Sequence, residues 1–234
     1  MSGGTGLKQK ILAIDCLKVM KQGVTFRDLS KQLKIPSGLL NRYINGDVLP
    51  KPDRAKHILS HFTRYGFNKS ITKLSRLGDG KYIVTGEILS QPFMLRIIAS
   101  KCYDVFPVKV DAVLSAAVDG IPLALITGDY YGAKALYAKK TQEIAFSDHY
   151  VSKGEMDKPL VSPFYLPKNM LGKGDKVLIV DDVIRGGSTS HALLSICQQA
   201  KAEIVGIFSI FATREALEKL GKENNIKTLF VIQG

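Results

Sequence analysis

The stretch from residue 177 to residue 189 constrains the fold of this chain more than any other. Its sequence, VLIVDDVIRGGST, has four apolar residues that favour β-structure, two adjacent acids, two glycines and two hydroxyl residues. Residues 190–202, which follow, have a helix-like composition. A short apolar run between polar flanks indicates a buried strand, and glycines at the start of a helix indicate a tight turn. The stretch therefore predicts a strand, a loop and a helix of an α/β protein.

The polar residues of this stretch suit a ribose phosphate. Asp181 and Asp182 follow the apolar run, and two ionised carboxylates at the end of a strand can bind the diol of a ribose. Backbone N–H groups at Gly186 and Gly187, placed before a helix, can bind a phosphate. A ribose 5-phosphate offers both groups. The alternative, an ordinary turn with two exposed aspartates, leaves the Gly-Gly-Ser-Thr sequence unexplained.

The same stretch resembles the 5-phosphoribosyl-1-pyrophosphate (PRPP) signature of type I phosphoribosyltransferases. The resemblance implies that Asp181 and Asp182 hold the ribose hydroxyls. The implied ligands of the 5-phosphate are Arg185, Gly186, Gly187, Ser188 and Thr189. Arg185 departs from the catalytic members, which usually carry a small hydroxyl residue or alanine there. A guanidinium can bind phosphate through two hydrogen bonds, or it can fill space that a base or pyrophosphate needs. PurR-type purine repressors also carry a basic residue there, so the resemblance favours a sensor over an enzyme.

A second segment resembles the pyrophosphate loop of the same family. It follows a strand-like run at 112–115, and its implied ligands are Ala117, Val118, Asp119 and Gly120. Asp119 departs from the family pattern, because an acid beside a diphosphate is unfavourable unless it turns away or meets Mg²⁺. The run at 136–138 resembles the next strand of the family, and Lys139 at its end is a further candidate for pyrophosphate. By composition alone Lys139 and Lys140 are a pair of surface lysines.

Residues 141–176 lack clear periodicity and are long for a loop, which is typical of a functional lid. In orotate phosphoribosyltransferases the equivalent segment carries a catalytic signature with lysine and histidine, and this stretch does not match it. We therefore assign no catalytic residue. The expected effector is PRPP or a nucleotide, and Mg²⁺ can accompany PRPP.

Positive charge is concentrated in the N-terminal third of the chain. Residues 1–78 contain 15 Lys and Arg against 4 Asp and Glu, whereas residues 79–234 contain 18 against 17. Nearly all of the net charge of +12 therefore belongs to the first part. A small basic module beside a nearly neutral larger one predicts binding to a polyanion.

Two short helices in the basic part resemble a helix-turn-helix of the phage-repressor type. The first is expected over 26–33, with Thr25 and Asp28 forming a capping box, and Lys34 stands at the turn. The second begins at Ser37 and ends before Gly46. The resemblance implies that the bases are read by Ser37, Gly38, Asn41 and Arg42. The implied phosphate contacts are Lys31, Lys34, Lys51, Arg54 and Lys56. A helical dimerisation domain with a solvated basic face is the alternative.

The rest of the chain alternates strand-like and helical runs, which predicts an α/β fold with a parallel, doubly wound sheet. We predict a helix-turn-helix DNA-binding domain at 1–65 and a linker at 66–81, where the sequence is polar and lacks strong periodicity. A type I phosphoribosyltransferase-like domain that binds the effector follows at 82–234. In such sheets ligands bind beyond the carboxyl ends of the strands, where we place Asp181 and Asp182.

Composition excludes several classes of protein. The three cysteines, Cys16, Cys102 and Cys197, are widely spaced and fit reduced thiols, and no metal site is predicted. No run of about 18 uncharged apolar residues is present, so no membrane span is expected. The N-terminus lacks the features of a signal peptide, which predicts a cytoplasmic protein.

The whole architecture resembles archaeal GfcR-type regulators and, in function, PurR-type repressors. This resemblance implies a transcription regulator that binds double-stranded DNA and responds to a phosphoribosyl ligand. A homodimer is expected, because helix-turn-helix proteins read paired half-sites about 34 Å apart. Two alternatives stay open. One is an active orotate or purine phosphoribosyltransferase with an added basic domain, and the other is an RNA-binding regulator of the attenuation type.

Overall fold

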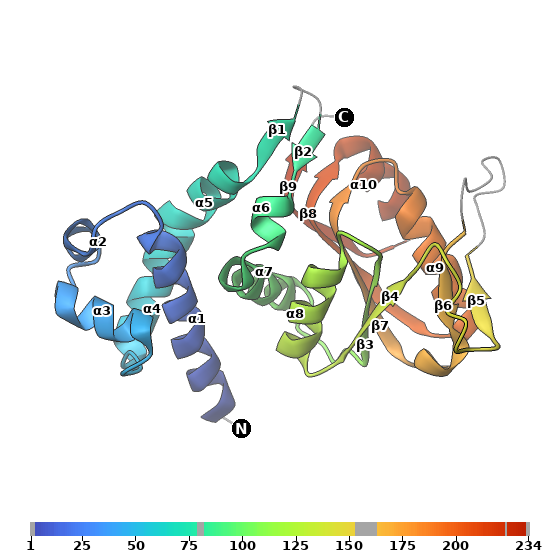
Figure 1. The fold of residues 1–234 in the computed structure, drawn as a ribbon, viewed down its shortest axis with the longest axis horizontal. Helices are drawn as coiled ribbons and strands as arrows, with labels where there is room; N and C mark the ends of the chain where they lie inside the picture. Colours follow the sequence, from blue (N-terminus) through green and yellow to red (C-terminus); the bar gives the residue numbers. More distant parts are fainter. Residues whose placement is uncertain (1–2, 79–81, 153–162, 223, 233–234) are drawn as a thin grey trace. The chain divides into compact units, whose positions relative to one another are not determined.

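The computed structural model of the chain describes residues 3–78, 82–152, 163–222 and 224–232. The chain divides into two compact units, Met1–Ile97 and Ile98–Gly234. Their helices and strands can be followed in Figure 1. The division falls within helix α7 (Pro92–Val105), whereas the sequence places the start of the second domain at residue 82. The domain boundaries at 65 and 81 stay predictions.

The first unit is mainly helical. Its elements are α1 (Gly3–Lys21), α2 (Phe26–Leu33), α3 (Ser37–Asn45), α4 (Pro52–His61), a π-helical turn η1 (Phe62–Gly66), α5 (Phe67–Leu74), the antiparallel strands β1 (Arg76–Gly78) and β2 (Tyr82–Val84), α6 (Gly86–Leu89) and the start of α7 (Pro92–Val105). Leucines and isoleucines of the first four helices form the core, among them Leu17, Leu29, Leu40 and Ile58, which are fully buried.

An ion pair joins the first and last long helices of this unit. Arg96 of α7 donates through Nε and Nη2 to the two carboxylate oxygens of Asp15 in α1, each at 2.7 Å. The Asp15 side chain is 3% exposed. A carboxylate that is buried so deeply needs a partner of opposite charge, and a bidentate guanidinium supplies one with favourable geometry.

Part of the stretch predicted as a linker, 66–81, is helical, and its role as a linker stays a prediction. Residues Phe67–Leu74 form helix α5, and Phe67, Ile71 and Leu74 are buried. These three residues are spaced by four and three positions, which places them on one face of a helix. The apolar stripe has only three members in a polar helix of eight residues, so its periodicity is weak in the sequence.

The second unit contains the predicted parallel sheet, in the order β4-β3-β7-β8-β9. Its strands are β3 (Ala112–Ala116), β4 (Lys134–Ala138), β7 (Lys176–Ile184), β8 (Glu203–Thr213) and β9 (Ile226–Ile232), and every pair is parallel. The helices between them are α8 (Ile121–Tyr131), α9 (Ser188–Ala200) and α10 (Arg214–Gly221). A smaller antiparallel pair, β5 (His149–Val151) and β6 (Tyr165–Pro167), precedes the 3-10 turn η2 (Lys168–Met170).

Both faces of the sheet are covered. Ala112, Leu114, Val177 and Ile179 share one hydrophobic core with residues of α9 and α10. The residues that alternate with them in β3 and β7 are also fully buried, as expected for a parallel sheet between two layers of helices. Right-handed crossovers place α8 on the face opposite α9, because β3 connects to β4 and β7 connects to β8.

Candidate functional site

Three loops meet at the carboxyl edge of the sheet. Lys139 follows β4, residues 117–120 follow β3, and residues 185–189 follow β7, and these three strands are neighbours. The chain leaves β3 towards β4 but leaves β7 towards β8, so the connections diverge between β3 and β7. This divergence is the switch point at which doubly wound sheets bind ligands. The fold therefore brings the three predicted phosphate-binding segments to one edge.

The loop after β7 forms a cradle at the N-terminus of α9. Gly187 has a φ of +80° and precedes the first helical residue, Ser188. Its left-handed conformation favours glycine, and the side chain of Leu220 packs against it. No side chain caps this helix, so the N–H groups of its first turn can donate to an anion.

The two acids lie inside β7 rather than after it, which corrects the sequence interpretation. The strand continues to Ile184 because β8 is long enough to pair with it well past the last residue paired with β3. Asp181 pairs in register with Ser209 of β8, and the backbone N–H of Asp182 donates to the Asp181 carboxylate at 3.0 Å. Both acids still lie at the carboxyl end of the strand, beyond its pairing with β3.

The environment of Asp181 disfavours its charge. Burial raises the pKa of the Asp181 carboxyl well above its ordinary value, and the neighbouring Asp182 and Asp119 carboxylates raise the pKa further. Asp119 belongs to the loop after β3, so its influence shows that the two loops lie close together. Hydroxyl groups that donate to these carboxylates, or a bound cation, would relieve this cost.

A metal ion at this edge of the sheet would need coordinating atoms from a bound ligand as well as from the protein. In the part of the chain that the structure describes, no three His, Cys, Asp or Glu side chains group closely enough to hold one. Mg²⁺ usually takes few protein ligands and completes its shell with substrate phosphates and water. Mg²⁺ would therefore fit here only together with a diphosphate. The three cysteines are buried and form no disulfide within the described residues, and burial raises the pKa of the Cys102 and Cys197 thiols to about 12.

The loop after β3 turns tightly back onto its own strand. Gly120 is buried, and a Cβ at this position would collide with the Ser115 hydroxyl. The peptide bond between Ala117 and Val118 is cis, and the Ala117 N–H donates to the Ala138 carbonyl at 2.9 Å. Val118 and Asp119 are exposed. The buried hydroxyl of Ser115 has no hydrogen-bond partner among the described residues, and the sequence does not single this residue out.

Lys139 already has an anionic partner. Its Nζ lies 2.5 Å from the Glu143 carboxylate, and both side chains are about one-third exposed. This contact raises the pKa of Lys139. The backbone of Lys139 pairs with that of Tyr165, which fixes the start of the loop. A pyrophosphate at Lys139 must therefore compete with Glu143, which the sequence interpretation does not include.

Thr213 supports the phosphate cradle from the neighbouring strand. Its hydroxyl donates to the Arg185 carbonyl at 2.5 Å and accepts from the Ala216 N–H at 3.1 Å. One side chain thus fixes the cradle and caps α10. A threonine directly before a helical segment is a recognisable N-cap, so the sequence predicts that Thr213 caps α10. No sequence signal indicates its hydrogen bond to the Arg185 carbonyl.

In the first unit, α2 and α3 have the bounds that the sequence predicts. Thr25 and Asp28 form the predicted capping box, and Lys34 adopts the left-handed conformation at the turn with a φ of +54°. Tyr43 is buried, and its hydroxyl accepts a hydrogen bond from Arg54 at 3.2 Å.

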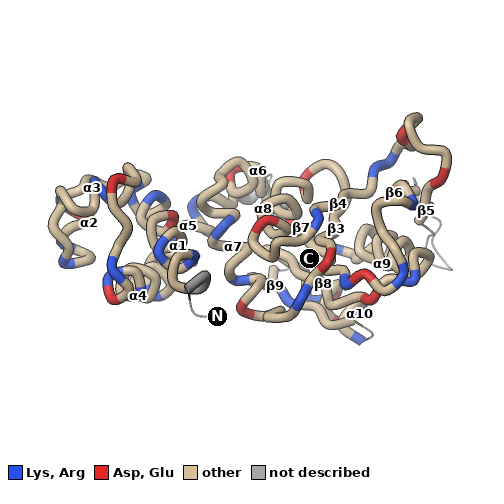
Figure 2. The backbone as a smooth tube through the Cα atoms, turned by 90° about the horizontal axis from the view of Figure 1, so that it is seen from below, with Lys and Arg blue, Asp and Glu red and all other residues tan. Residues whose placement is uncertain are grey.

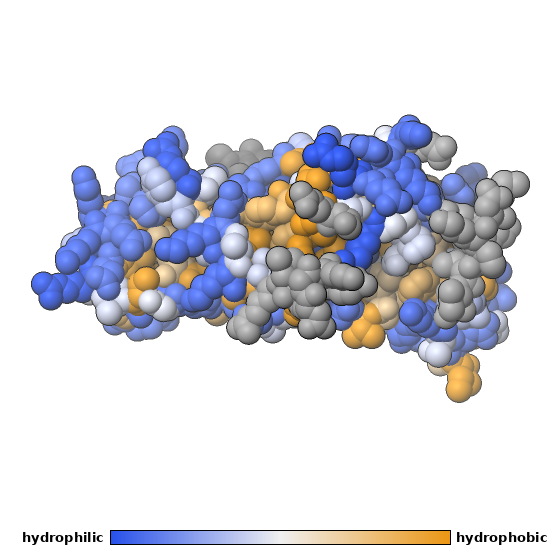
Figure 3. Space-filling model, turned by 90° about the horizontal axis from the view of Figure 1, so that it is seen from above, coloured by the Kyte–Doolittle hydropathy of each residue, from blue (hydrophilic) through white to orange (hydrophobic). Residues whose placement is uncertain are grey.

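The predicted DNA-contact residues are accessible. The candidates for base contacts and for phosphate contacts are exposed in every case: Ser37, Gly38, Asn41, Arg42, Lys31, Lys34, Lys51, Arg54 and Lys56. Lys and Arg recur along this unit in Figure 2, and the face of it seen in Figure 3 is largely hydrophilic.

Comparison with known proteins identifies the second unit. A family model described as a phosphoribosyl transferase domain matches residues 85–233. The chain belongs to this family. Adenine phosphoribosyltransferase from Rhodothermus marinus has the same fold, with a TM-score of 0.63, 17% identity, and coverage of 71% of this chain and 98% of the enzyme.

Two curated relatives extend the likeness. A probable purine biosynthesis transcriptional regulator PurR of Streptococcus pneumoniae is 32% identical over 69% of this chain, and the match spans 60% of the regulator. Xanthine phosphoribosyltransferase of Lactococcus lactis is 30% identical over 42% of this chain, spanning 51% of that enzyme. The predicted likeness to PurR-type regulators that carry this domain is thus confirmed, whereas the archaeal likeness stays a prediction.

In the described residues, no helix is both long and apolar enough to span a membrane.

Proposed function

We propose that this chain is a DNA-binding transcription regulator of nucleotide metabolism that senses PRPP or a nucleotide 5-monophosphate. The proposal depends on two features that occur together in this chain. One is a phosphate cradle with two adjacent acids at the switch point of the sheet. The other is a basic unit in which α3 exposes Asn41 and Arg42. The likeness to a PurR regulator supports this reading, since that protein is named for transcriptional control.

The effector acts by differential binding. Its ribose hydroxyls donate to Asp181 and Asp182, its 5-phosphate accepts from residues 185–189, and any pyrophosphate meets residues 117–120 and Lys139. Binding orders the loop 141–165, of which residues 153–162 lie outside the described part. A ligand changes DNA affinity only when it binds two arrangements of the protein with different affinity. We propose a cytoplasmic homodimer whose two α3 helices read paired half-sites.

A DNA titration at fixed salt, with and without PRPP, tests this proposal. We expect PRPP or a nucleotide 5-monophosphate to change the Kd for the operator. The double variant Asp181→Asn/Asp182→Asn should bind the operator as tightly as the wild type and lose the response to ligand. If the double variant loses DNA binding as well, the two acids support the structure rather than sense a ligand. Preference for RNA over duplex DNA would instead indicate a regulator of the attenuation type.

The intact cradle and acid pair favour a second candidate, an orotate or purine phosphoribosyltransferase. Arg185 argues against it, because catalytic members usually carry a small residue at this position of the cradle. Glu143 also argues against it, because it holds Lys139, which the leaving pyrophosphate would contact. The discriminating assay mixes the protein with PRPP, Mg²⁺ and each free base and measures pyrophosphate release. Turnover of about 1 per second or faster would establish an enzyme and contradict a role limited to sensing.

A further inference from the structure

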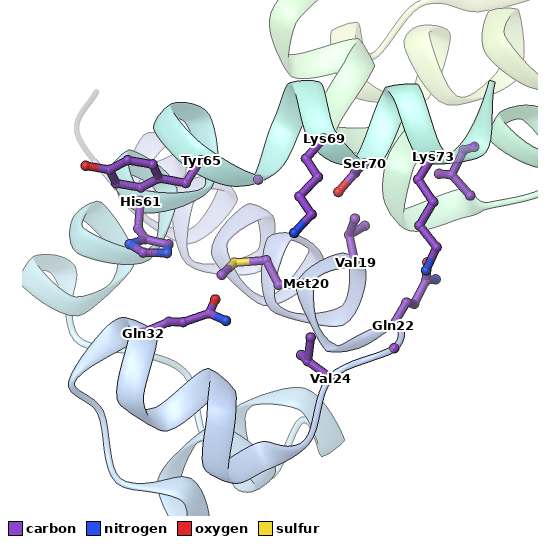
Figure 4. Close-up of a pocket in the computed structure, with 13 residues that line it drawn as sticks. Val19, Met20, Gln22, Val24, Gln32, His61, Tyr65, Lys69, Ser70 and Lys73 are labelled. Atoms are coloured by element: carbon purple, nitrogen blue, oxygen red, sulfur yellow. The ribbon is translucent and has the colours of Figure 1, made fainter. Parts of the chain in front are cut away.

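The first unit contains a pocket of about 230 Å³, bounded by the end of α1, by α2, and by the segment from the end of α4 through α5 (Figure 4). Every residue that lines it belongs to this unit. It is separate from the exposed residues of α3 and from the cradle at 185–189, so neither proposed activity accounts for it.

Two lysines supply the charge of this pocket. Lys69 and Lys73 lie one turn apart on α5, and Figure 4 shows both side chains extending from that helix towards α1 and Gln22. No Asp or Glu lines the pocket, and neither lysine forms an ion pair within the described residues. Both lysines are exposed, and like charges four residues apart on one helix repel each other weakly. A bound anion with two negative charges would relieve that repulsion.

Further hydrogen-bonding groups line the same pocket. Ser70 lies between the lysines on α5, Gln32 reaches the pocket from α2, and His61 comes from the end of α4 (Figure 4). Burial lowers the pKa of His61, and the nearby His57 lowers it further. Its imidazole is therefore neutral near pH 7 and contributes hydrogen bonds rather than charge.

Apolar side chains form much of the remaining wall, beside Gln22. These side chains are Val19, Met20, Val24 and Leu74, with the ring of Tyr65 at the edge. A methionine side chain adapts its shape to a ligand, and aromatic rings stack on flat groups. Gly23 turns in the left-handed conformation with a φ of +86°, and a Cβ there would lie 3.3 Å from Lys73 Nζ. The backbone of Gly23 therefore lies at the edge of the pocket, next to the Lys73 ammonium group.

We propose that this pocket is a second ligand site, which binds a small phosphate monoester with an apolar or aromatic body. The paired lysines match a dianion, and the apolar wall matches the ester group. The volume is below the range of about 300–1,000 Å³ typical of sites for drug-sized ligands, so the ligand is small. A phosphate of the DNA backbone would leave the apolar wall without a partner, which favours a free ligand.

Residue-resolved NMR with phenyl phosphate tests this site on the full chain. The amides of Gly23 and Ser70 should shift and saturate on titration, whereas uncharged benzyl alcohol should leave them unchanged. Lys69→Gln/Lys73→Gln should raise the Kd at these amides about tenfold or more, because two charge-assisted contacts are lost. The matched control Lys222→Gln/Lys227→Gln removes the same charge from exposed positions of the second unit and should keep the wild-type Kd.

Three results would overturn the proposal. One is an absence of shifts at Gly23 and Ser70 with phenyl phosphate at millimolar concentration. Another is the same Kd at these amides in the wild type and in Lys69→Gln/Lys73→Gln. The third is a loss of DNA binding in that variant without any effect of phenyl phosphate on the wild type, which would make the two lysines DNA contacts. Because the comparison of phenyl phosphate with benzyl alcohol uses the wild type, it decides the question even if the double variant does not fold.

Discussion

The carboxyl of Asp181 couples the stability of the ligand-free protein to pH. Its pKa is raised by burial and by Asp182 and Asp119, so the unfolded chain loses this proton at lower pH than the folded chain does. The stability that it contributes is fully present below the unfolded pKa and is lost as pH rises through the folded pKa. Asp181→Asn removes the titration, so we expect the variant to have the higher thermal midpoint at neutral pH.

This difference should shrink as pH falls below about 3.9, the ordinary pKa of an aspartate, because the wild-type carboxyl is then protonated in both states. Circular dichroism melts at a series of pH values measure it, and Glu218→Gln, at an exposed position of α10, serves as a control for the loss of one negative charge. A variant that is less stable than the wild type at every pH would show that the Asp181 carboxylate stabilises the fold.

Glu143 is the anionic partner of Lys139 in the ligand-free protein. The two side chains form an ion pair at 2.5 Å, and partly exposed pairs of this kind contribute about 0.2–1 kcal/mol. Glu143→Gln should therefore tighten binding of PRPP by up to about fivefold, because the pyrophosphate no longer competes with a carboxylate. Ribose 5-phosphate, which lacks the pyrophosphate, is the control ligand and should bind both proteins equally in a calorimetric titration. Equal gains for the two ligands would place the pyrophosphate away from Lys139.

Site residues that lie in one continuous stretch can be recognised from the sequence alone. Asp181, Asp182 and the cradle form one stretch, so their pattern is visible without the fold. Glu143 and Thr213 act through contacts with Lys139 and Arg185, and a single acid or hydroxyl in the sequence does not indicate which of many partners it will contact. Ser115 matters only because Gly120 folds back onto it.

The N-terminus of α9 depends on one of its two preceding glycines. Gly187 has a φ of +80°, and an added Cβ would press on Leu220 at 3.3 Å, whereas Gly186 has open space and no positive φ. Gly187→Ala should therefore lower the free energy of unfolding by about 1–2 kcal/mol, since a left-handed conformation is unfavourable for residues with a Cβ. Gly186→Ala should change it by less than about 0.5 kcal/mol. Urea denaturation of the two variants compares them, and equal losses would contradict this assignment.

Elements with explicit start and stop signals are the ones whose bounds the sequence predicts. Thr25, Asp28 and Gly46 mark the ends of α2 and α3, and the structure has these helices at the expected residues. Helix α5 lacks a capping side chain and continues from a π-helical turn, so no local signal separates it from a linker. The length of β7 depends on pairing with β8, which no local pattern contains.

At the scale of the whole molecule, the N-terminal and C-terminal parts of the chain differ in net charge. Residues 1–78 carry nearly all of the net charge, and residues 79–234 are almost neutral. Charge of one sign attracts a polyanion without specifying a sequence, whereas a nearly neutral cradle can select one phosphorylated ligand through directed hydrogen bonds. The division was visible in the sequence because it depends only on composition, although its consequence for DNA binding depends on which lysines are exposed.

The salt dependence of DNA binding measures this division directly. Each phosphate contact releases counterions and contributes about −0.9 to the slope of log K against log salt concentration. The exposed residues Lys51 and Lys56 are two of the expected contacts, so Lys51→Gln/Lys56→Gln should make the slope about 2 units less steep per chain. Lys222→Gln/Lys227→Gln removes equal charge from the second unit and should leave the slope unchanged, because a slope counts contacts rather than net charge.

Fluorescence anisotropy with a labelled operator over a series of salt concentrations gives both slopes. Equal changes in slope for the two pairs would mean that DNA binding depends on the total charge of the chain. The first unit would then not be the DNA-binding surface.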